Sequence, residues 1–406
     1  MMTNHNASYQ FCLAARRKAA LALCLALCML ALGLSANAQK HRIVTFDAPD
    51  AGTGAGQGTT AVGIIPDGSI LGYYVDADGV YHGLLRTPNG RMTEFEALGA
   101  GTGAGQGVQP WMGMNSMRMI VGSYWDTNNV SHGFLRAPDG KFTTFDAPCA
   151  GTSSGLGSGG VSINFAGLVF GACMDANNVH HSFLRTSHNN YTIFDAPGAG
   201  STSGQGTWPD TFAGINDAGA VVGFFLDSSY GVHGFVRSQD GVITTIDAPG
   251  ASTGVWLGTY AGAINPKDTI TGYYSDASGV FHGFVRTAHG SFTIFDVPGA
   301  AAGFWLGTFP EDINPAGVIV GNYVDENGAN HGFECSPDGK IAEFDVVTAG
   351  TESGQGTVPY GINPAGAITG FFVDSNGVSH GFLRFPSPPP CRSGERRQPW
   401  EKCDDH

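Results

Sequence analysis

Short apolar runs alternate with turn residues along almost the whole chain. Within residues 356–384, the runs Val358–Ile362, Ala367–Val373 and Val378–Arg384 are rich in β-branched and aromatic residues. Asn-Pro-Ala-Gly and Asp-Ser-Asn-Gly separate them, and these residue types favour tight turns. The pattern predicts three antiparallel strands joined by hairpins. Earlier units continue through a Pro-Asp-Gly or Pro-Asn-Gly turn into a fourth strand, such as Lys141–Phe145.

This unit recurs, and the start of its third strand reads almost His-Gly-Phe-Leu-Arg each time. The spacings between successive histidines are 50, 49, 52, 49, 49 and 49 residues. A period near fifty that contains several turns is typical of closed or stacked repeat folds. The repeated histidines are His82, His132, His181, His233, His282, His331 and His380.

The two ends of the repeat region complement each other. His41–Phe46 has the form of a fourth strand with no first three ahead of it, whereas the last unit has only three strands before Pro386. Prolines there cannot continue a sheet. We therefore predict an all-β fold, a seven-bladed β-propeller over residues 39–384. Its four-stranded antiparallel blades are closed by the N-terminal strand, which completes the last blade.

The repeated elements resemble a known family. Gly361–Gly370, with the pattern Gly-Ile-Asn-Pro-Ala-Gly, and His380–Phe382 are similar to the HAF extracellular-repeat family of bacterial exported proteins. The middle residue of this His-x-Phe element is Gly in six units and Ser182 in one, never the Ala of the family name. The resemblance covers residues 41–384 and implies export and repetition, without a particular activity.

The first 38 residues have the features of a secretory signal peptide. Three cations, Arg16, Arg17 and Lys18, precede the apolar run Ala19–Leu34, and Ala36–Ala38 supplies a small-residue cleavage site. We expect cleavage after Ala38, export to the periplasm or the exterior, and no stable membrane span. The Pro-rich tail, residues 385–406, is predicted to be disordered or looped by a disulfide.

Charge and cysteine content limit the partners and the chemistry. The formal net charge of −14 becomes −17 once the three signal-peptide cations are removed. An acidic chain without a basic stripe is a poor nucleic-acid binder, so we expect none, and we expect a monomer. Two acids per repeat are predicted to cap turns. They are Asp76, Asp126, Asp175, Asp227, Asp276, Asp325 and Asp374, and at strand ends Asp47, Glu96, Asp146, Asp195, Asp247, Asp296 and Asp345.

Five cysteines remain after the signal peptide. Cys149 and Cys173 fall in one repeat and are a candidate disulfide, and Cys391 and Cys403 could close a loop in the tail. Cys335 replaces the usual arginine of the repeat. No spacing of Cys and His suggests zinc, and we expect no metal or cofactor.

The seven histidines invite a metal or relay hypothesis, but packing explains them better. Hairpin register places His82 opposite Tyr74 and Phe95, so we expect a buried imidazole bonded to a backbone carbonyl or a turn aspartate. The Asp76–Gly79 turn has two carboxylates but lacks the later bidentate ligand of a calcium loop. Gly52–Gly58 precedes a strand, whereas phosphate-binding glycine loops open a helix.

Candidate ligand residues lie where the repeats differ. Val108–Asn115 and Thr207–Asn216 are longer than the corresponding stretches of other units, and both carry tryptophan. Trp256 and Trp305 replace glycine in two adjacent connecting loops. Aromatic side chains near carboxylates and amides suit stacking on sugar rings. The candidate ligand-binding residues are Trp111, Trp208, Asp210, Tyr260, Glu311 and Tyr360.

Three functions fit this pattern. The first is an exported binding module that recognises a glycan or surface polymer through the loop face. The second is a propeller hydrolase or lyase acting on a polysaccharide, which needs converging carboxylates such as Asp210, Glu311 and Asp312. The third is a purely structural envelope protein. No catalytic Ser/His/Asp or Cys/His arrangement stands apart from the repeat.

Overall fold

The first complete repeat shows how turn chemistry builds the fold. In the computed structural model, β2 (Gly58–Ile64), β3 (Ile70–Val75), β4 (Tyr81–Arg86) and β5 (Met92–Phe95) pair antiparallel in chain order. The turn between β3 and β4 is held by Asp76, whose Oδ1 accepts the N–H groups of the residues two and four positions later. The predicted turns therefore set the strand order.

The structure describes residues 42–386, except 112 and 210–213. The signal peptide, the tail from Ser387 with Cys391 and Cys403, and Asp210 lie outside these residues. All regular elements of the described part are strands, and it holds no helix long and apolar enough to cross a membrane. Residues 43–386 form one compact unit.

The same order of pairing recurs along residues 107–384. The remaining strands are β6 (Gly107–Gln109), β7 (Ile120–Trp125), β8 (Ser131–Arg136), β9 (Phe142–Phe145), β10 (Gly157–Ile163), β11 (Val169–Met174), β12 (His180–Arg185), β13 (Tyr191–Phe194), β14 (Gly206–Pro209), β15 (Val221–Leu226), β16 (Val232–Arg237), β17 (Ile243–Ile246), β18 (Thr259–Ile264), β19 (Ile270–Ser275), β20 (Phe281–Arg286), β21 (Phe292–Phe295), β22 (Thr308–Ile313), β23 (Ile319–Val324), β24 (Asn330–Cys335), β25 (Ile341–Phe344), β26 (Gly356–Ile362), β27 (Ile368–Val373) and β28 (Ser379–Arg384).

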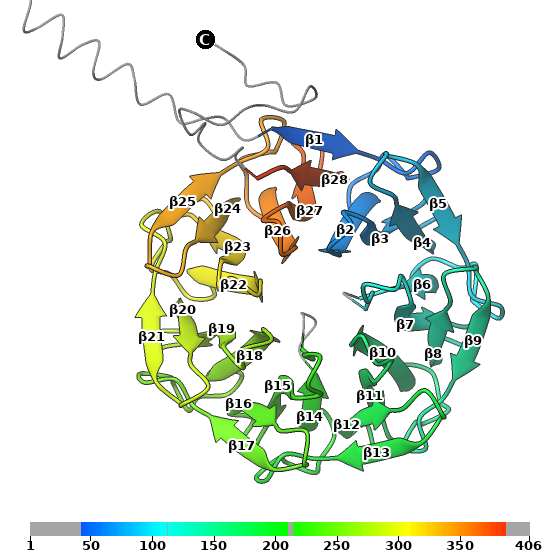
Figure 1. Ribbon diagram of the computed structural model, residues 1–406, viewed down its shortest axis with the longest axis horizontal. Coiled ribbons are helices and arrows are strands. Elements are labelled where there is room, and N and C mark those ends of the chain that lie inside the picture. The colour runs from blue at the N-terminus through cyan, green and yellow to red at the C-terminus, as the bar shows by residue number, and fades with distance from the viewer. Residues whose placement is uncertain (1–41, 112, 210–213, 387–406) are drawn as a thin grey trace, which may run out of the picture. The chain divides into compact units, whose positions relative to one another are not determined.

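These strands are arranged around a central axis as a β-propeller (Figure 1). The first strand of each group, such as β2 or β10, lies nearest the axis, and the fourth, such as β5 or β13, lies at the periphery. The N-terminal strand β1 (Ile43–Phe46) pairs antiparallel with β28, and Phe46 lies opposite Gly381. The predicted completion of the last blade by the N-terminal strand is confirmed.

The glycine of the repeated His-Gly-Phe element makes room for a phenylalanine. Phe95 on β5 lies opposite Gly83, and a Cβ atom on Gly83 would overlap the Phe95 ring. The prediction that Phe95 lies opposite His82 was therefore wrong by one residue. The Phe95 ring also supports the next blade, because the Arg136 guanidinium lies 5.1 Å from its centroid. One aromatic ring thus packs both within and between blades.

The connections between blades and the turns between second and third strands share one face. The connection 96–106 runs from β5 to β6, and its Gly105 N–H donates to Gly79 O in the turn between β3 and β4. The N–H of Tyr81 on β4 in turn donates to the carbonyl of Gln106. We call this side, formed by the connections and the turns between second and third strands, the connection face.

Asparagine side chains link the turns on the opposite face. The Asn115 amide donates to the carbonyl of Asn164, which lies in the corresponding turn of the next blade, and Asn164 donates to Asn216. The series continues to Asn363, whose amide donates to Ile65 O across the closure. These buried side chains satisfy carbonyls that the strands leave without partners.

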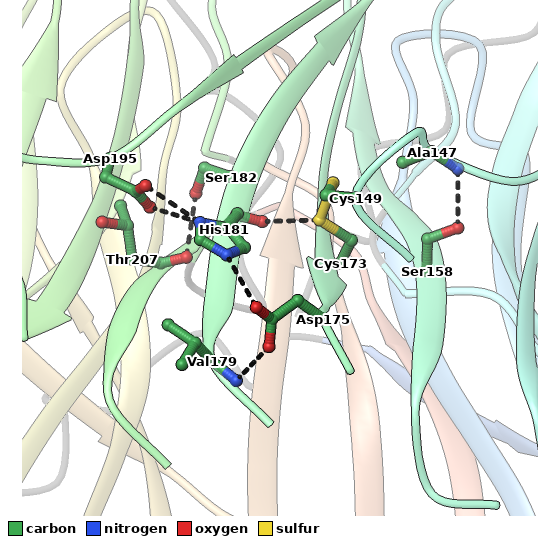
Figure 2. The surroundings of a disulfide bond; sticks show 10 residues. All are labelled: Ala147, Cys149, Ser158, Cys173, Asp175, Val179, His181, Ser182, Asp195 and Thr207. Atoms are coloured by element: carbon green, nitrogen blue, oxygen red, sulfur yellow. Dashed lines mark hydrogen bonds and ion pairs between the residues drawn. A yellow bond between two sulfur atoms is a disulfide. The ribbon is translucent and has the colours of Figure 1, made fainter. Parts of the chain in front are cut away.

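One blade carries a disulfide in place of an aromatic contact. In other blades a second-strand ring faces a glycine of the connection, as Tyr124 faces Gly99 and Tyr274 faces Gly250. Here Cys149 and Cys173 occupy these two positions and are bonded, so the predicted pairing is confirmed (Figure 2). Cys335 is a buried free thiol.

Candidate functional site

Each repeated histidine lies between two carboxylates on the connection face. Figure 2 shows His181 between Asp195 and Asp175. Across the seven repeats, Nδ1 lies 2.5–2.9 Å from the acid that ends the fourth strand. Nε2 lies 3.1–3.8 Å from the turn aspartate. The expected bond to a turn aspartate is closest at His82, whose Nε2 is 3.1 Å from Asp76.

The strand-end acids therefore have a different role from the predicted one. They were predicted to cap turns, but Asp146 and its equivalents accept a hydrogen bond from the histidine ring instead. The turn aspartates do cap backbone N–H groups as predicted, as Asp126 does for Asn128 and Val130. The second-strand aromatic stacks on the imidazole, with the Tyr74 and His82 centroids 4.7 Å apart.

This environment changes the pKa of two of the histidines. Burial lowers the pKa of His82, but hydrogen bonds to Asp76 and Glu96 outweigh it and raise the pKa above its usual value. The same balance raises the pKa of His331, which lies between Asp345 and Asp325. Within the described residues, no group of three or more His, Cys, Asp or Glu side chains could hold a metal ion.

A second feature lies between the blades near the axis. In two adjacent blades, a residue near the start of the innermost strand and the residue opposite it on the second strand are both aromatic. Trp208 pairs with Phe224, and their rings stack at 5.4 Å. Tyr260 pairs with Tyr273 in the next blade, with centroids 5.0 Å apart. Rings of successive blades also touch, because Phe224 lies 5.1 Å from Tyr260 and Tyr273 lies 5.3 Å from Phe309.

The β10–β11 blade has only small residues at these two positions. Gly159 pairs with Ala172, whereas the corresponding pair in every other blade includes at least one larger side chain, such as Gln109, Trp208 or Phe371. A cavity of about 260 Å³ results, and the tryptophans Trp111, Trp125 and Trp208 line it. We call it the tryptophan pocket. It reaches Gly157, at the end of a connection, and therefore lies toward the connection face.

The polar groups of the tryptophan pocket are uncharged. Gln109, Ser123, Ser131, Ser158 and His180 line it, and none of its lining residues is Asp, Glu, Lys or Arg. The Ser131 hydroxyl donates to Ser158 O, and the Ser158 hydroxyl accepts the N–H of Ala147. The pocket therefore combines aromatic surfaces with neutral hydrogen-bonding groups.

His180 is neutral at physiological pH. Its ring centroid lies 4.0 Å from that of Trp208. Burial, together with repulsion from His181, lowers the pKa of His180 to about 4, although Asp175 opposes this. A neutral imidazole can donate at one nitrogen and accept at the other, which suits a hydroxyl-bearing ligand.

The structure brings two of the predicted site residues together and separates the others. Trp111 and Trp208 both line the tryptophan pocket. Tyr260 is 8% exposed and packs among Phe224 and neighbouring rings, so it belongs to the interblade core. Tyr360 is half-buried beside Phe371, and Glu311 is buried on β22.

Sequence reasoning missed four contributors to the tryptophan pocket. Trp125 and His180 occupy ordinary strand positions, while Gly159 and Ala172 matter because their side chains are small. The signal available in the sequence was the first strand Gly-Ser-Gly-Gly, since the other first strands have a residue larger than glycine at the position of Gly159.

Two of the three acids considered for catalysis, Glu311 and Asp312, lie among the described residues and are held in the interior. Asp312 follows Glu311 on β22, and its carboxylate accepts the N–H groups of Ile313 and Ile362. Burial raises the pKa of Asp312 to about 6, although both hydrogen bonds lower it. This carboxylate ties β22 to β26 of the next blade.

Comparison with solved structures identifies the same fold. The BP39L lectin from Burkholderia pseudomallei matches with a TM-score of 0.50 and 11% identity, covering 85% of this chain and 96% of that one. A puromycin hydrolase matches with a TM-score of 0.47 and 14% identity over 82% of this chain and 55% of its own. AofleA from Arthrobotrys oligospora matches with a TM-score of 0.40 and 14% identity, covering 78% of this chain and 89% of that one. No protein-family model and no curated protein matches the sequence. At such low identity, the lectin similarity supports the β-propeller fold alone.

Proposed function

We propose that this protein is a carbohydrate-binding β-propeller module and that the tryptophan pocket binds one neutral sugar unit. The observation that carries the proposal is the pair Gly159 and Ala172. These residues leave a space at positions where every other blade has at least one larger side chain, and tryptophans line that space. The lectin similarity adds the fold only.

The chemistry of the lining favours a sugar over other small ligands. Indole faces stack against the C–H faces of a pyranose, and serine, glutamine and neutral imidazole groups bond hydroxyls. A volume of 260 Å³ lies just below the ~300–1,000 Å³ of typical ligand pockets, so it suits a single ring. Because the lining residues include no ionisable acid or base beyond neutral His180, an uncharged sugar fits best.

The same lining favours binding over turnover. Glycoside hydrolysis uses two carboxyl groups that flank the bond, and none of the described lining residues carries one. Glu311 and Asp312 are neighbours on one buried strand and lie outside the lining. We therefore place the binding module ahead of the polysaccharide hydrolase or lyase and of the structural envelope protein.

The proposal includes the finer architecture and the location. We propose seven blades of four strands, membership of the HAF repeat family, and action as a monomer outside the cytoplasm after cleavage at Ala38. The repeated strand pairings and the β1–β28 closure support the blade count. The Cys149–Cys173 bond supports export, because disulfides persist in oxidising compartments.

The test is a glycan array on the purified protein, followed by calorimetric titration of the best mono- or disaccharide. Trp111→Ala and Trp208→Ala should each weaken binding at least tenfold. Ala172→Phe should abolish it by filling the pocket with a residue type found at the equivalent position of other blades, as at Phe224 and Phe371.

The matched control is Tyr360→Ala. Tyr360 lies four residues after the first residue of β26, as Trp111 does for β6, but it lies outside the pocket lining. Its removal should leave the affinity unchanged. Absence of sugar binding by the wild type, or equal binding by Ala172→Phe, would refute the proposal.

A further inference from the structure

Two neighbouring connections expose large apolar side chains on the connection face. Val255 and Trp256 are 63% and 42% exposed, and Phe304 and Trp305 are 65% and 49% exposed. We call these four residues the aromatic platform. The equivalent positions in the other five connections hold a small residue followed by glycine. They are Ala55-Gly56, Ala104-Gly105, Ser154-Gly155, Ser203-Gly204 and Ser353-Gly354.

Both platform tryptophans adopt a backbone conformation that disfavours them. Trp256 has φ 59° and Trp305 has φ 64°, in the left-handed region, where their glycine equivalents have φ between 77° and 84°. A side chain with a Cβ atom is disfavoured in this region, because the Cβ comes too close to the following carbonyl oxygen. Burial does not compensate fully, because both rings are more than 40% exposed. The fold gains little from these side chains, so we look to a ligand for their use.

The loop backbone is the same with or without tryptophan. Trp256 N–H donates to Tyr230 O, and Trp305 N–H donates to Gly279 O. The glycine-containing connections make the equivalent bond, such as Gly105 N–H to Gly79 O. Glycine at positions 256 and 305 therefore preserves every backbone contact of these loops.

Neighbouring rings hold the platform in place. Trp305 lies edge-on to Phe281 at 5.4 Å and to Phe304 at 5.9 Å. Trp256 lies 6.3 Å from Tyr230, whose hydroxyl donates to Ser203 O in the connection that leads to β14. Pre-positioned exposed rings can bind a ligand with little loss of side-chain entropy.

Charge on the connection face selects the kind of ligand. None of its connections or turns contains Lys or Arg, whereas each contains at least one Asp or Glu. The two platform connections and the turns that they contact contain Asp227, Asp247, Asp276 and Asp296, each beside a repeat histidine. An acidic face repels anionic lipid surfaces and acidic polymers. A neutral polysaccharide combines the apolar faces and hydroxyls that aromatic rings and carboxylates bind.

We propose that the aromatic platform is a second subsite for a neutral polysaccharide chain, whose other contact is the tryptophan pocket. This inference rests on the proposed function of that pocket. Both sites belong to the connection face, and the contacts of Trp256 with Tyr230 and of Tyr230 with Ser203 lead toward β14, which carries Trp208. Two linked contacts raise the affinity for a polymer far above that for a single sugar.

The experiment compares polymer and short-sugar binding in the Trp256→Gly/Trp305→Gly variant. Cellulose, chitin, xylan and mannan are used in pull-down assays, with calorimetry of the pocket's mono- or disaccharide. For the polymer that binds the wild type in the pull-down assay, we expect the glycine variant to have at least tenfold lower affinity. Binding of the short sugar and the melting temperature should be unchanged, or the latter raised, since glycine relieves the left-handed strain.

The control removes two exposed apolar residues from other connections of the same face. Leu98 and Val347 are 90% and 96% exposed, and Leu98→Ala/Val347→Ala should bind the polymer normally. The proposal is overturned if the glycine variant binds the polymer as well as the wild type does. It is also overturned if none of the four polymers binds the wild type. Platform-dependent binding to phosphatidylcholine/phosphatidylglycerol vesicles in place of polymer also overturns it. Loss of short-sugar binding in Ala172→Phe tests the pocket separately.

Discussion

Replacing both cysteines of the Cys149–Cys173 disulfide by alanine should lower the stability of the propeller by an amount that follows from the loop it closes. The two residues are 24 positions apart. The chain-entropy relation gives about 3.5 kcal/mol for a loop of this length. With an unfolding entropy of ~2.1 cal/mol/K per residue over residues 43–386, this corresponds to a fall in melting temperature of about 5 °C.

A second variant separates loss of the crosslink from loss of packing. Cys149→Gly/Cys173→Tyr restores the contact found in other blades, where Tyr124 and Tyr274 face Gly99 and Gly250. Burying the tyrosine ring should restore ~2 kcal/mol of the lost stability. The ring also gives His181 the aromatic partner that its equivalents have. We therefore expect the wild type to have the highest melting temperature, the Gly/Tyr variant an intermediate one and the Ala/Ala variant the lowest.

The assay is thermal unfolding followed by circular dichroism, with and without reductant. Reductant should lower the melting temperature of the wild type alone and leave both variants unchanged. Equal wild-type values under the two conditions would refute the entropic estimate. A Gly/Tyr variant no more stable than the Ala/Ala variant would refute the view that the disulfide replaces an aromatic contact.

Three further predictions concern the repeat itself. Phe46→Ala should lower the free energy of unfolding, measured by thermal unfolding, by ~3–5 kcal/mol, since Phe46 is 8% exposed and lies under the Arg86 guanidinium. An equal loss of stability from Ile43→Ala, at a half-buried position of the same strand, would contradict a special role of Phe46 in closure. Gly83→Ala should cost ~1–3 kcal/mol because its Cβ overlaps the Phe95 ring, whereas Gly54→Ala meets only the flexible Gln57 and should be tolerated. Glu96→Gln should lower the melting temperature most near pH 6 and little at pH 9. Because the folded-state pKa of His82 is raised, its protonation stabilises the fold fully below the unfolded pKa, and this stabilisation disappears as pH rises through the folded pKa. A fall in melting temperature that does not depend on pH, or an equal fall in Asp78→Asn, would contradict this.

The sequence allowed most of the fold to be predicted because its turns carry their own chemistry. Asp374 and its equivalents fix hairpins through contacts within five residues, so strand order and closure follow from local patterns. The register of β5 could not be predicted as well, since it is a four-residue strand. Its end is set by the Glu96 contact with His82, fourteen residues away.

The candidate site was harder to predict for a different physical reason. Trp111 and Trp208 stood out because the fold does not repeat them, but their convergence depends on the angle between blades. The tryptophan pocket is also defined by missing volume at Gly159 and Ala172, which lie on different strands. Small residues in a repeat look unremarkable until the neighbours that fail to fill the space are known.

The pairing of β1 with β28 places a kinetic constraint on the chain. His380 contacts Asp47 across 333 residues, so the strand that emerges first from the ribosome must wait for the last blade before it finds its partner. Until then, β1 has no neighbour in its own blade and the edge of the last sheet stays open. Contacts of such long range form slowly. A chain interrupted before Ser379 would therefore keep the blades between β2 and β25 but leave β1 and one edge of β27 unpaired. Unpaired strand edges are prone to proteolysis and aggregation.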